Sequence, residues 1–525
     1  MSDACRRSPC FRSGRRASQD AFPRRAWERC ACFVVHRYPP YNGCPPVALN
    51  STVPHPFDPF YRYACLLTVL AASAIAFWGL GSIPLLSLNE ARRALPVQAM
   101  LAGGDWLLPR LNGELYITKP PLFYWLGAMV AELRGAVDEW AVRLPSALAA
   151  LAVLWTGYRV AMRWFGRWSA LFAVQILLAN AGFAVFARRA EIEMLLTALC
   201  SLSLLAALAY VLDQRSRRWL WLSYGLLGLA LLTKGPVALL FVTLPLLGYA
   251  LYSRDPRAWQ ALRCAEGWLL LLLVGLSWYA AVAARLGLDA WLGVIQGDML
   301  GKMQGSEGSR EPFYYYLLWV LGDFFPAILL LLIRPKTLPQ SWLQQPACVA
   351  LLLGVLLPLL AFSLFGDKHA KYLLPAYPAL ALLLGQQLGA LAEQHGLRWL
   401  KVLGVLLPLG WAAYFALGEA RLYHYRYSAL PQIADFLHDH DTIPVYAYRQ
   451  IDMRTVYYHG RPIAVLPAEN AAATLAQTAP ALLLAEHDVI AEVAALPGVC
   501  VLREFAPYLK RGKKAVVYGN GALCS

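Results

Sequence analysis

The sequence predicts a polytopic α-helical membrane protein that ends in a small α/β region. The 525 residues are 59% hydrophobic and only 15% charged, with a mean hydropathy of +0.46, whereas soluble domains carry roughly 25% charged residues. Apolar runs recur between Tyr63 and Leu417, and each is about 20 residues long, enough to cross a hydrocarbon core. After Leu417 the composition shifts to short segments rich in β-branched and aromatic residues, which is typical of strands.

Residues 1–60 precede the first apolar run. They are rich in arginine and hold five of the 11 cysteines. Because they contain no apolar core of the kind a cleaved signal needs, they do not resemble a signal peptide, and Cys30 and Cys32 have no partner pair at zinc spacing. We expect a disordered N-terminal extension or a start codon assigned too early.

The region 61–420 is expected to form the membrane domain. A count of apolar runs gives eleven spans, and eleven to thirteen agree with the pattern. The runs lie near 63–84, 144–162, 169–187, 190–212, 219–233, 236–252, 267–284, 314–333, 347–365, 372–391 and 400–417.

The net charge of +15 comes largely from basic clusters in short loops between these runs. This distribution follows the positive-inside rule and places the N-terminus in the cytoplasm. Nucleic-acid binding is excluded as a function class, since no basic domain or reading helix is present. Four polar loops, 88–140, 188–193, 286–312 and 366–371, then converge on the opposite, periplasmic face.

Region 421–525 is expected to be a periplasmic α/β domain. Strands are predicted at 443–449, 455–458, 462–466, 481–485, 499–505 and 515–518, and helices at 430–438 and 468–477. No glycine-rich loop opens a helix, so nucleotide binding is not assigned. Cys500 and Cys524 can pair if this region lies outside the cytoplasm, where disulfides persist.

Charged residues concentrate in the first outer loop, 85–142, and ionisable groups beside a membrane indicate a functional site. This layout suits transfer of a sugar from a lipid-linked phosphate. Cations such as Lys119 and Arg92 would stabilise the leaving phosphate, and a carboxylate would accept the proton of an acceptor hydroxyl. Lys119 precedes two prolines that stiffen the chain, although a lysine at a helix start can also snorkel to the interface.

Other candidate site residues lie at or just before the start of later spans. Glu193 begins one run, where it either serves the reaction or interacts with the helix dipole. Lys368, Lys371 and Tyr372 form a basic group on the outer face, which suggests a bound anion or an interfacial anchor. Arg310 precedes a run of tyrosines. No group of His, Asp or Glu has the spacing of a metal site, so neither a metal nor another cofactor is expected.

Several motifs make the chain resemble a known family. They are NEARR at 89–93, GGDWLLPRLNGELYITKPPLFYW at 103–125, LLTKGP at 231–236, GSREPFYYYL at 308–317 and KYLLPAYPALALLLG at 371–385. Together they resemble the bacterial lipid A aminoarabinose transferases, which are related to the protein O-mannosyltransferases. The resemblance covers about residues 60–420 and implies a GT-C membrane fold with an undecaprenyl-phosphate sugar donor.

The resemblance also implies roles for individual residues. Lys119 matches the lysine proposed to hold the donor phosphate, and Tyr116 and Tyr372 match family tyrosines. Glu193 stands where the family usually has an aspartate. Asn89 replaces the proposed catalytic aspartate, which the family carries in the motif Asp-Glu-x-Arg-Tyr.

Three accounts of Asn89 remain: Glu90 serves as the base, the acceptor is a phosphate that needs no base, or the protein is inactive. We favour Glu90, with Glu193 as a second carboxylate of the same cleft. The chain is thus expected to be an inner-membrane glycosyltransferase with its site facing the periplasm, acting on lipid A, another glycan or a protein. The alternatives are a lipid or glycan flippase and a non-catalytic relative that binds lipid.

Overall fold

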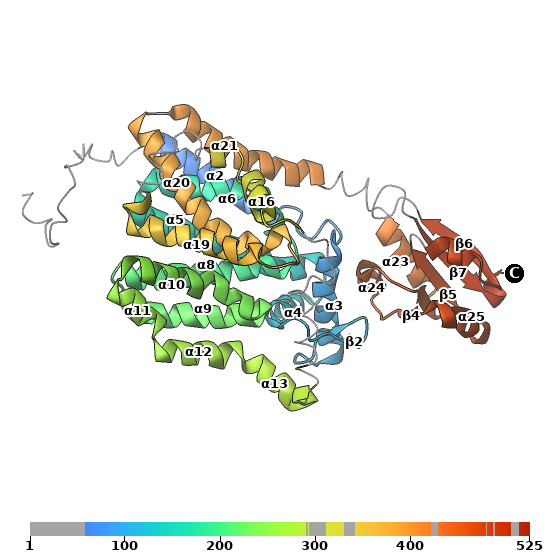
Figure 1. The fold of residues 1–525 in the computed structure, drawn as a ribbon. Helices are drawn as coiled ribbons and strands as arrows, with labels where there is room; N and C mark the ends of the chain where they lie inside the picture. The colour runs from blue at the N-terminus through green and yellow to red at the C-terminus, as the bar shows by residue number, and fades with distance from the viewer. Residues whose placement is uncertain are drawn as a thin grey trace, which may run out of the picture. The chain divides into compact units, whose positions relative to one another are not determined.

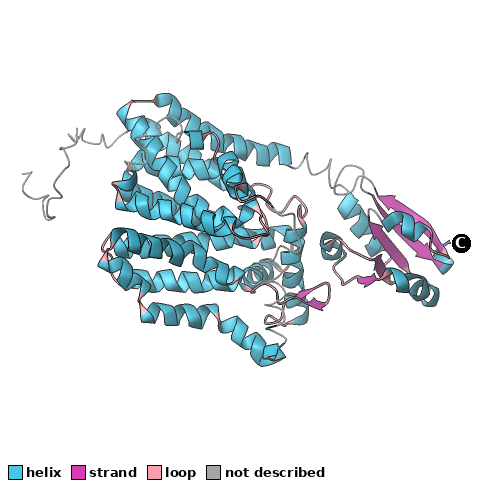
Figure 2. Cartoon of the chain, viewed as in Figure 1, coloured by secondary structure: helices cyan, strands magenta, loops and turns pink. Residues whose placement is uncertain are grey.

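A computed structural model describes residues 58–289, 311–329, 342–419, 429–478, 480–486, 489–505 and 514–524, together with residues 292 and 421. The chain divides into two compact units, Met1–Asp58 and Pro59–Ser525. The expected N-terminal extension therefore lies outside the described residues, except at its last positions. Within the second unit, helices dominate, and strands are confined to one short hairpin and the C-terminal region (Figure 2).

Six helical segments among the described residues are long and apolar enough to cross a membrane. They are α2 (Pro59–Phe77), α5 (Glu139–Phe165), α8 (Ile192–Val211), η3 with α10 (Pro236–Ser253), α19 (Pro346–Ser363) and α21 with η7 (Arg398–Gly418). A seventh forms if α11 and α12 (Pro256–Gly275) are joined to α13 (Ser277–Leu286) across a bend of 43°.

The remaining expected spans fall on shorter or interrupted helices. They correspond to α6 (Arg167–Ala179) with α7 (Ala181–Phe186), α9 (Arg218–Lys234), α16 (Tyr315–Asp323), and η6 (Ala370–Ala376) with α20 (Tyr377–Gln394). Asn180 separates α6 from α7, and its side chain caps α7 by accepting from the backbone N–H of Phe183. The polytopic helical fold is confirmed, whereas the count of eleven spans stays a prediction.

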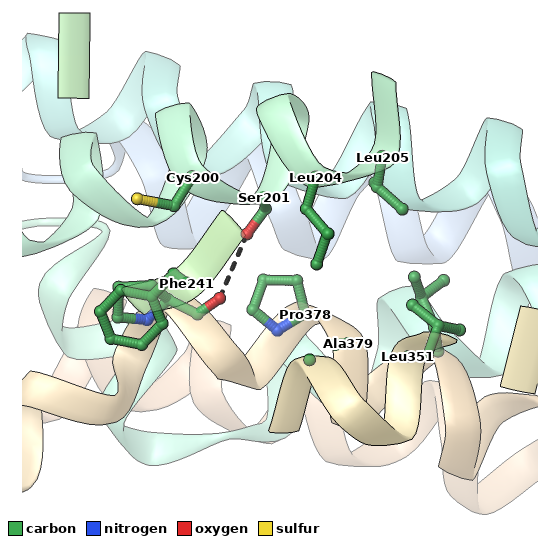
Figure 3. A pocket seen from close by; sticks show the side chains of 11 residues that line it. Cys200, Ser201, Leu204, Leu205, Phe241, Leu351, Pro378 and Ala379 are labelled. Carbon is green, nitrogen blue, oxygen red and sulfur yellow. Dashed lines mark hydrogen bonds between the residues drawn. The ribbon is translucent and has the colours of Figure 1, made fainter. Parts of the chain in front are cut away.

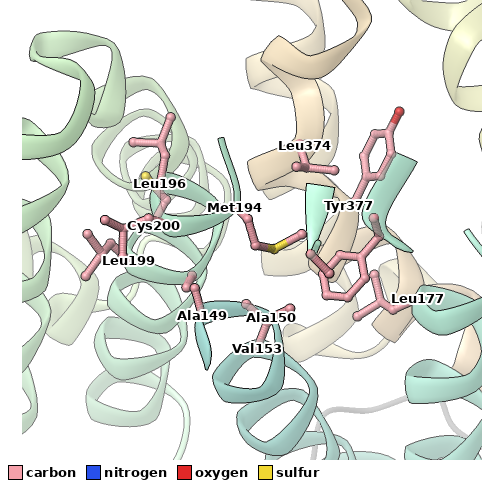
Figure 4. Packing of buried hydrophobic residues seen from close by; sticks show 14 of the residues in the cluster. Ala149, Ala150, Val153, Leu177, Met194, Leu196, Leu199, Cys200, Leu374 and Tyr377 are labelled. Carbon is pink, nitrogen blue, oxygen red and sulfur yellow. The ribbon is translucent and has the colours of Figure 1, made fainter. Parts of the chain in front are cut away.

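Helix α8 lies in the interior of the bundle and packs against α5, α9 and η6 (Figure 1). It is apolar on all sides and buried along almost its whole length, as expected of a helix surrounded by others. Small side chains allow close approach: Ala149 and Ala150 of α5 lie near Met194 of α8 (Figure 4). This packing fixes the first turn of α8, and the polar residues there, inside the protein.

The first outer loop folds into helix α3 (Leu88–Gly103), a hairpin and helix α4 (Leu122–Arg134). Ser87 and Glu90 form a capping box that starts α3. The hairpin pairs β1 (Arg110–Leu111) with β2 (Glu114–Leu115), and its two turn residues, Asn112 and Gly113, both have positive φ. Asn-Gly is the pair that such a turn favours.

The C-terminal region contains a five-stranded sheet in the order β4-β3-β5-β7-β6. Its strands are β3 (Val445–Tyr448), β4 (Ala464–Leu466), β5 (Leu482–Glu486), β6 (Val499–Phe505) and β7 (Ala515–Asn520), and its helices are α23 (Ala429–Asp439), α24 (Met453–His459), α25 (Ala468–Gln477) and α26 (Ile490–Ala494). β3 runs parallel to β4 and β5, whereas β7 runs antiparallel to β5 and β6. The expected small α/β region is present, while its start at residue 421 stays a prediction.

One predicted strand, 455–458, is wrong, because this segment lies in helix α24. Asp452 caps the helix by accepting from the backbone N–H of Arg454, and Gly460 ends it in the left-handed conformation. These two caps outweigh the β-branched and aromatic composition of the segment.

Helix α24 packs against α3 and is hydrogen-bonded to the chain that precedes it. Arg454 Nη1 donates to the carbonyl of Leu86 at 2.9 Å, and the backbone N–H of Leu85 donates to the hydroxyl of Tyr458 at 2.7 Å. The same hydroxyl donates to Glu139 at 2.6 Å. The C-terminal region thus holds the entry to α3 in place.

A disulfide joins Cys500 of β6 to Cys524, the pairing that the sequence allowed. The bond closes a loop between residues 24 apart in the sequence, so breaking it releases chain entropy in the unfolded state. We expect Cys500→Ser with Cys524→Ser to destabilise the C-terminal region by about 2–4 kcal/mol. Limited proteolysis of the full-length protein in detergent would reveal this as faster cleavage within 430–525, and equal cleavage rates would contradict it.

Candidate active site

Glu90 is fully buried, and both of its carboxylate oxygens are engaged by the fold. Oε1 accepts from Arg143 Nε at 2.8 Å and from the backbone N–H of Ala190 at 3.1 Å, while Oε2 accepts from the N–H groups of Leu86 and Ser87. Burial alone would raise the pKa of Glu90, but the charge and hydrogen bond of Arg143, together with the charge of Arg189 and the N–H of Ala190, bring it below its ordinary value. Because protein donors already enclose both oxygens, Glu90 presents no oxygen to an acceptor hydroxyl in this arrangement, which argues for a structural role, and the assignment of Glu90 as the base stays a prediction.

A cluster of four charged side chains lies beside this ion pair, at the first turn of α8. Lys234, at the end of α9, is 3.3 Å from Glu193 Oε1, and Lys371 of η6 is 3.4 Å from the same oxygen. Lys371 also binds Glu191 Oε2 at 3.2 Å. The four residues come from three separate segments of the chain, and we call them the charged cluster.

Arg93 of α3 adds a third positive charge next to the charged cluster. Its Nη1 donates to the hydroxyl of Tyr124 at 2.7 Å and to that of Tyr116 at 3.4 Å, and it interacts electrostatically with Glu193. Burial opposes the charged form of Arg93, yet the pKa of the guanidinium is raised by Tyr124, Tyr116 and Glu193. Arg93 therefore stays charged, and the cations here outnumber the carboxylates.

Within the charged cluster, Glu191 and Lys371 both have a raised pKa. Burial raises the pKa of Glu191, and the neighbouring carboxylate of Glu193 raises it further. Burial would lower the pKa of Lys371, but the two glutamates more than offset this and raise it. Lys371 therefore stays protonated and positively charged, whereas Glu191 binds a proton more readily than an ordinary glutamate.

The structure brings several predicted residues together and leaves others apart. Glu193, Lys371 and Tyr372 meet, since the ring of Tyr372 lies 4.6 Å from Lys234 Nζ. Tyr116 joins them through Arg93. Lys368 is different: it is buried and donates to the backbone carbonyls of Glu311 and Phe365, which is a structural role.

Three candidates of the first outer loop, Asn89, Arg92 and Lys119, are half-buried or exposed. Asn89 is half-buried at the start of α3 and Arg92 is exposed one turn later. Lys119 is half-buried and donates to the carbonyl of Thr118 at 3.3 Å. Arg310 lies outside the described residues, as does most of the loop 286–312. The other three predicted polar loops do meet in the structure: Glu90 accepts from the backbone N–H of Ala190, and Lys371 binds Glu191.

Sequence reasoning missed Glu191, Lys234 and Arg143 as site residues. A signal existed for Lys234, since it lies in the motif LLTKGP, and for Arg143, an arginine within an apolar span. Ionisable groups in such places usually have a partner. Glu191 carried no such signal, because only the fold shows that it faces Lys371.

Two cavities lie apart from the charged cluster. One, of about 10 Å³, lies among Ser201, Leu204, Phe241 and Pro378, where Ser201 Oγ donates to the carbonyl of Pro375 (Figure 3). The other, of about 240 Å³, is bounded mainly by apolar residues of α6, of α21 and of the segment 323–329. In the described ranges, no group of three or more His, Cys, Asp or Glu side chains is placed to hold a metal ion, and independence from metals stays a prediction.

Comparisons with known proteins bear on the fold and on the family resemblance. Residues 118–283 match a family model described as dolichyl-phosphate-mannose-protein mannosyltransferase. The structure of ArnT from Cupriavidus metallidurans bound to undecaprenyl phosphate superposes with a TM-score of 0.73, covering 88% of this chain and 99% of that one at 21% identity. The chain has the GT-C fold.

Curated relatives with similar sequences are described as arabinosyl transferases. The undecaprenyl phosphate-alpha-4-amino-4-deoxy-L-arabinose arabinosyl transferase of Pseudomonas aeruginosa (strain LESB58) is 34% identical over 62% of this chain. The protein of the same description from Pectobacterium atrosepticum is 30% identical over 60% of it. The matches span 60% and 57% of those relatives' own lengths. The resemblance to the aminoarabinose transferase-like glycosyltransferases is confirmed, and the chain is a multi-pass protein of the bacterial inner membrane.

Proposed function

We propose that the protein transfers a sugar from an undecaprenyl-phosphate donor to an acceptor of the cell envelope. The observation that carries this proposal is the excess of positive charge beside the first turn of α8. Among the described residues, Arg93, Lys234 and Lys371 lie beside two carboxylates, those of Glu191 and Glu193. A bound phosphate would balance that excess, and buried cations stabilise a leaving phosphate better than cations in water do.

The donor phosphate is proposed to lie between the charged cluster and the first outer loop. Lys119 is the ligand that the family resemblance assigns, and Arg92 is proposed from its charge in the same loop. Arg93 Nη1 donates to the hydroxyl of Tyr116, a further proposed ligand. Burial raises the pKa of Tyr116, but the charges of Arg93 and Arg92 and the hydrogen bonds from Arg93 and Thr118 together lower it below its ordinary value, which indicates a positive environment in this part of the loop. Arg310 remains a further proposed ligand.

The site is proposed to face the periplasm. Basic clusters mark the opposite loops as cytoplasmic. The C-terminal region hydrogen-bonds to the first outer loop at Leu85, Leu86 and Asn112, so both lie on one side of the membrane. Its disulfide supports an oxidising compartment for that side.

Lipid A is the first acceptor to test, since relatives in the resembling family modify it. We expect mass spectrometry of lipid A from a strain that expresses the gene to show a pentosamine-sized addition that is lost on deletion. An unchanged spectrum would rule out lipid A as the acceptor under those conditions and direct the search to other envelope glycans and glycoproteins.

The rival functions differ in what happens to the donor. The purified protein in nanodiscs would be incubated with undecaprenyl-phosphate sugars and an extract of envelope lipids and glycans. A glycosyltransferase releases undecaprenyl phosphate. A flippase moves the donor across a vesicle membrane without cleaving it, and a non-catalytic relative binds undecaprenyl phosphate with no turnover, so either result would contradict the proposal.

A further inference from the structure

Ser87 and Glu191 are hydrogen-bonded to each other where the first outer loop meets α8. Ser87 Oγ donates to Glu191 Oε1 at 2.9 Å and accepts from the backbone N–H of Glu90 at 3.1 Å. A hydroxyl has one donor and two acceptor positions. With one donor and one acceptor position used, the half-buried Ser87 can still accept one more hydrogen bond.

The side chain of Glu191 is buried although it does not cap its own helix. It is the N-cap residue of α8, yet its side chain makes no capping hydrogen bond. Its side chain is only 3% exposed and contacts Ser87 on one oxygen and Lys371 on the other. Glu90, by contrast, accepts from backbone N–H groups of three residues and pairs with Arg143. The partners of Glu191 are thus side chains of two other outer segments and not backbone N–H groups of its own helix, an arrangement that leaves its carboxylate in direct contact with a hydroxyl that can exchange a proton.

We infer that Ser87 and Glu191 form a proton relay that deprotonates the acceptor hydroxyl of the transfer reaction. The acceptor oxygen forms its bond to the anomeric carbon, and the bond from that carbon to the donor phosphate oxygen breaks. The bonding electrons leave with undecaprenyl phosphate. The acceptor proton passes to Ser87 Oγ while the serine proton passes to Glu191 Oε1, so atoms and charge balance.

This inference rests on the proposed function and deepens it for an acceptor that presents a hydroxyl, since a phosphate acceptor would need no base. It also accounts for Asn89, whose amide cannot accept a proton: the carboxylate is supplied from the next outer loop instead of from α3. Lys371 contributes by holding Glu191 in place and by balancing its charge before the proton arrives.

The electrostatic surroundings of Glu191 favour this role. The charged groups that act on it are Glu193 and Arg189 on adjacent turns, Lys371 of η6 and Glu90 of α3. Burial and Glu193 raise the pKa of Glu191, which makes its carboxylate a stronger base. Because the base works only when unprotonated, turnover is expected to fall on the acidic side at a higher pH than an ordinary glutamate would give.

The test compares four variants with the wild type in nanodiscs, using undecaprenyl-phosphate sugars and the envelope extract. Glu191→Gln preserves the shape of the side chain and is expected to lower kcat by about 100-fold or more, while binding of labelled undecaprenyl phosphate is retained or tightened because a negative charge beside the phosphate is removed. Glu191→Asp should restore part of the activity. Ser87→Gly keeps an acceptable helix cap but removes the hydroxyl and should also lower kcat, whereas Ser87→Thr should retain it.

The pH profile separates a relay from a structural role. The acidic limb of the wild-type profile should vanish from the residual activity of Glu191→Gln. If the wild type turns over but Glu191→Gln and Ser87→Gly stay within about twofold of it, the relay is overturned while the proposed function stands. If the wild type cleaves none of the donors, the proposed function itself fails, and the relay fails with it.

Discussion

Replacing Lys371 with alanine should abolish turnover. Lys371 is the one described cation that binds both Glu191 and Glu193, and it belongs to the excess positive charge proposed to stabilise the leaving phosphate. Removing one such electrostatic group typically costs about 100- to 1,000-fold in kcat. The loss should appear as a lower rate of undecaprenyl phosphate release, followed by mass spectrometry.

Two comparisons make this result specific. Lys371→Arg keeps the charge and should retain more activity than Lys371→Ala, although an arginine does not reproduce the compact ammonium. Arg461→Ala removes an exposed basic residue of the C-terminal region, where it pairs with Asp441, and should leave the rate unchanged. A Lys371→Ala protein that turns over normally would show that the charged cluster is structural.

The membrane fold could be predicted from composition and the lengths of apolar runs, because a bilayer imposes both. Glu193, Lys371 and Tyr372 could be singled out for a related reason, since charged residues at the ends of spans are costly and rarely incidental. Their meeting could not be predicted, because the glutamate and lysine of the Glu191–Lys371 pair are 180 positions apart in the sequence. Apolar periodicity shows where helices lie but not which of their ends come together.

Glu90 shows a different limit. Its place in the first-loop motif suggested a catalytic carboxylate, and its neighbour Asn89 made that suggestion stronger. The motif alone does not reveal that Arg143, 53 positions later, pairs with it. A helix-capping acid and a catalytic acid have the same signature in a sequence, and only burial and the number of hydrogen-bond donors distinguish them.

Replacing Glu90 with glutamine should therefore lower the stability of the fold and leave the rate of sugar transfer per folded molecule nearly unchanged. Glutamine leaves Arg143 buried without a counter-charge and turns an amide NH₂ towards backbone donors. Breaking one side of a buried ion pair costs about 3–5 kcal/mol. The melting temperature in detergent should fall accordingly, while kcat per folded molecule stays within about threefold of the wild type. Normal stability with lost turnover would restore Glu90 as the base.

The pairing also predicts how stability depends on pH and on Arg143. Because the pKa of Glu90 is lowered in the folded state, its contribution is complete above the ordinary glutamate pKa and is lost as the pH falls towards the lowered value. Arg143 Nη1 also donates to the carbonyls of Leu80 and Ile83 at 2.8 and 2.6 Å, so Arg143→Met should destabilise at least as much as Glu90→Gln. The double variant should lose less than the sum of the two single losses, because each single change already breaks the same ion pair. Additive losses would instead mean that Glu90 and Arg143 stabilise the fold separately, and the carboxylate would again be available for another task.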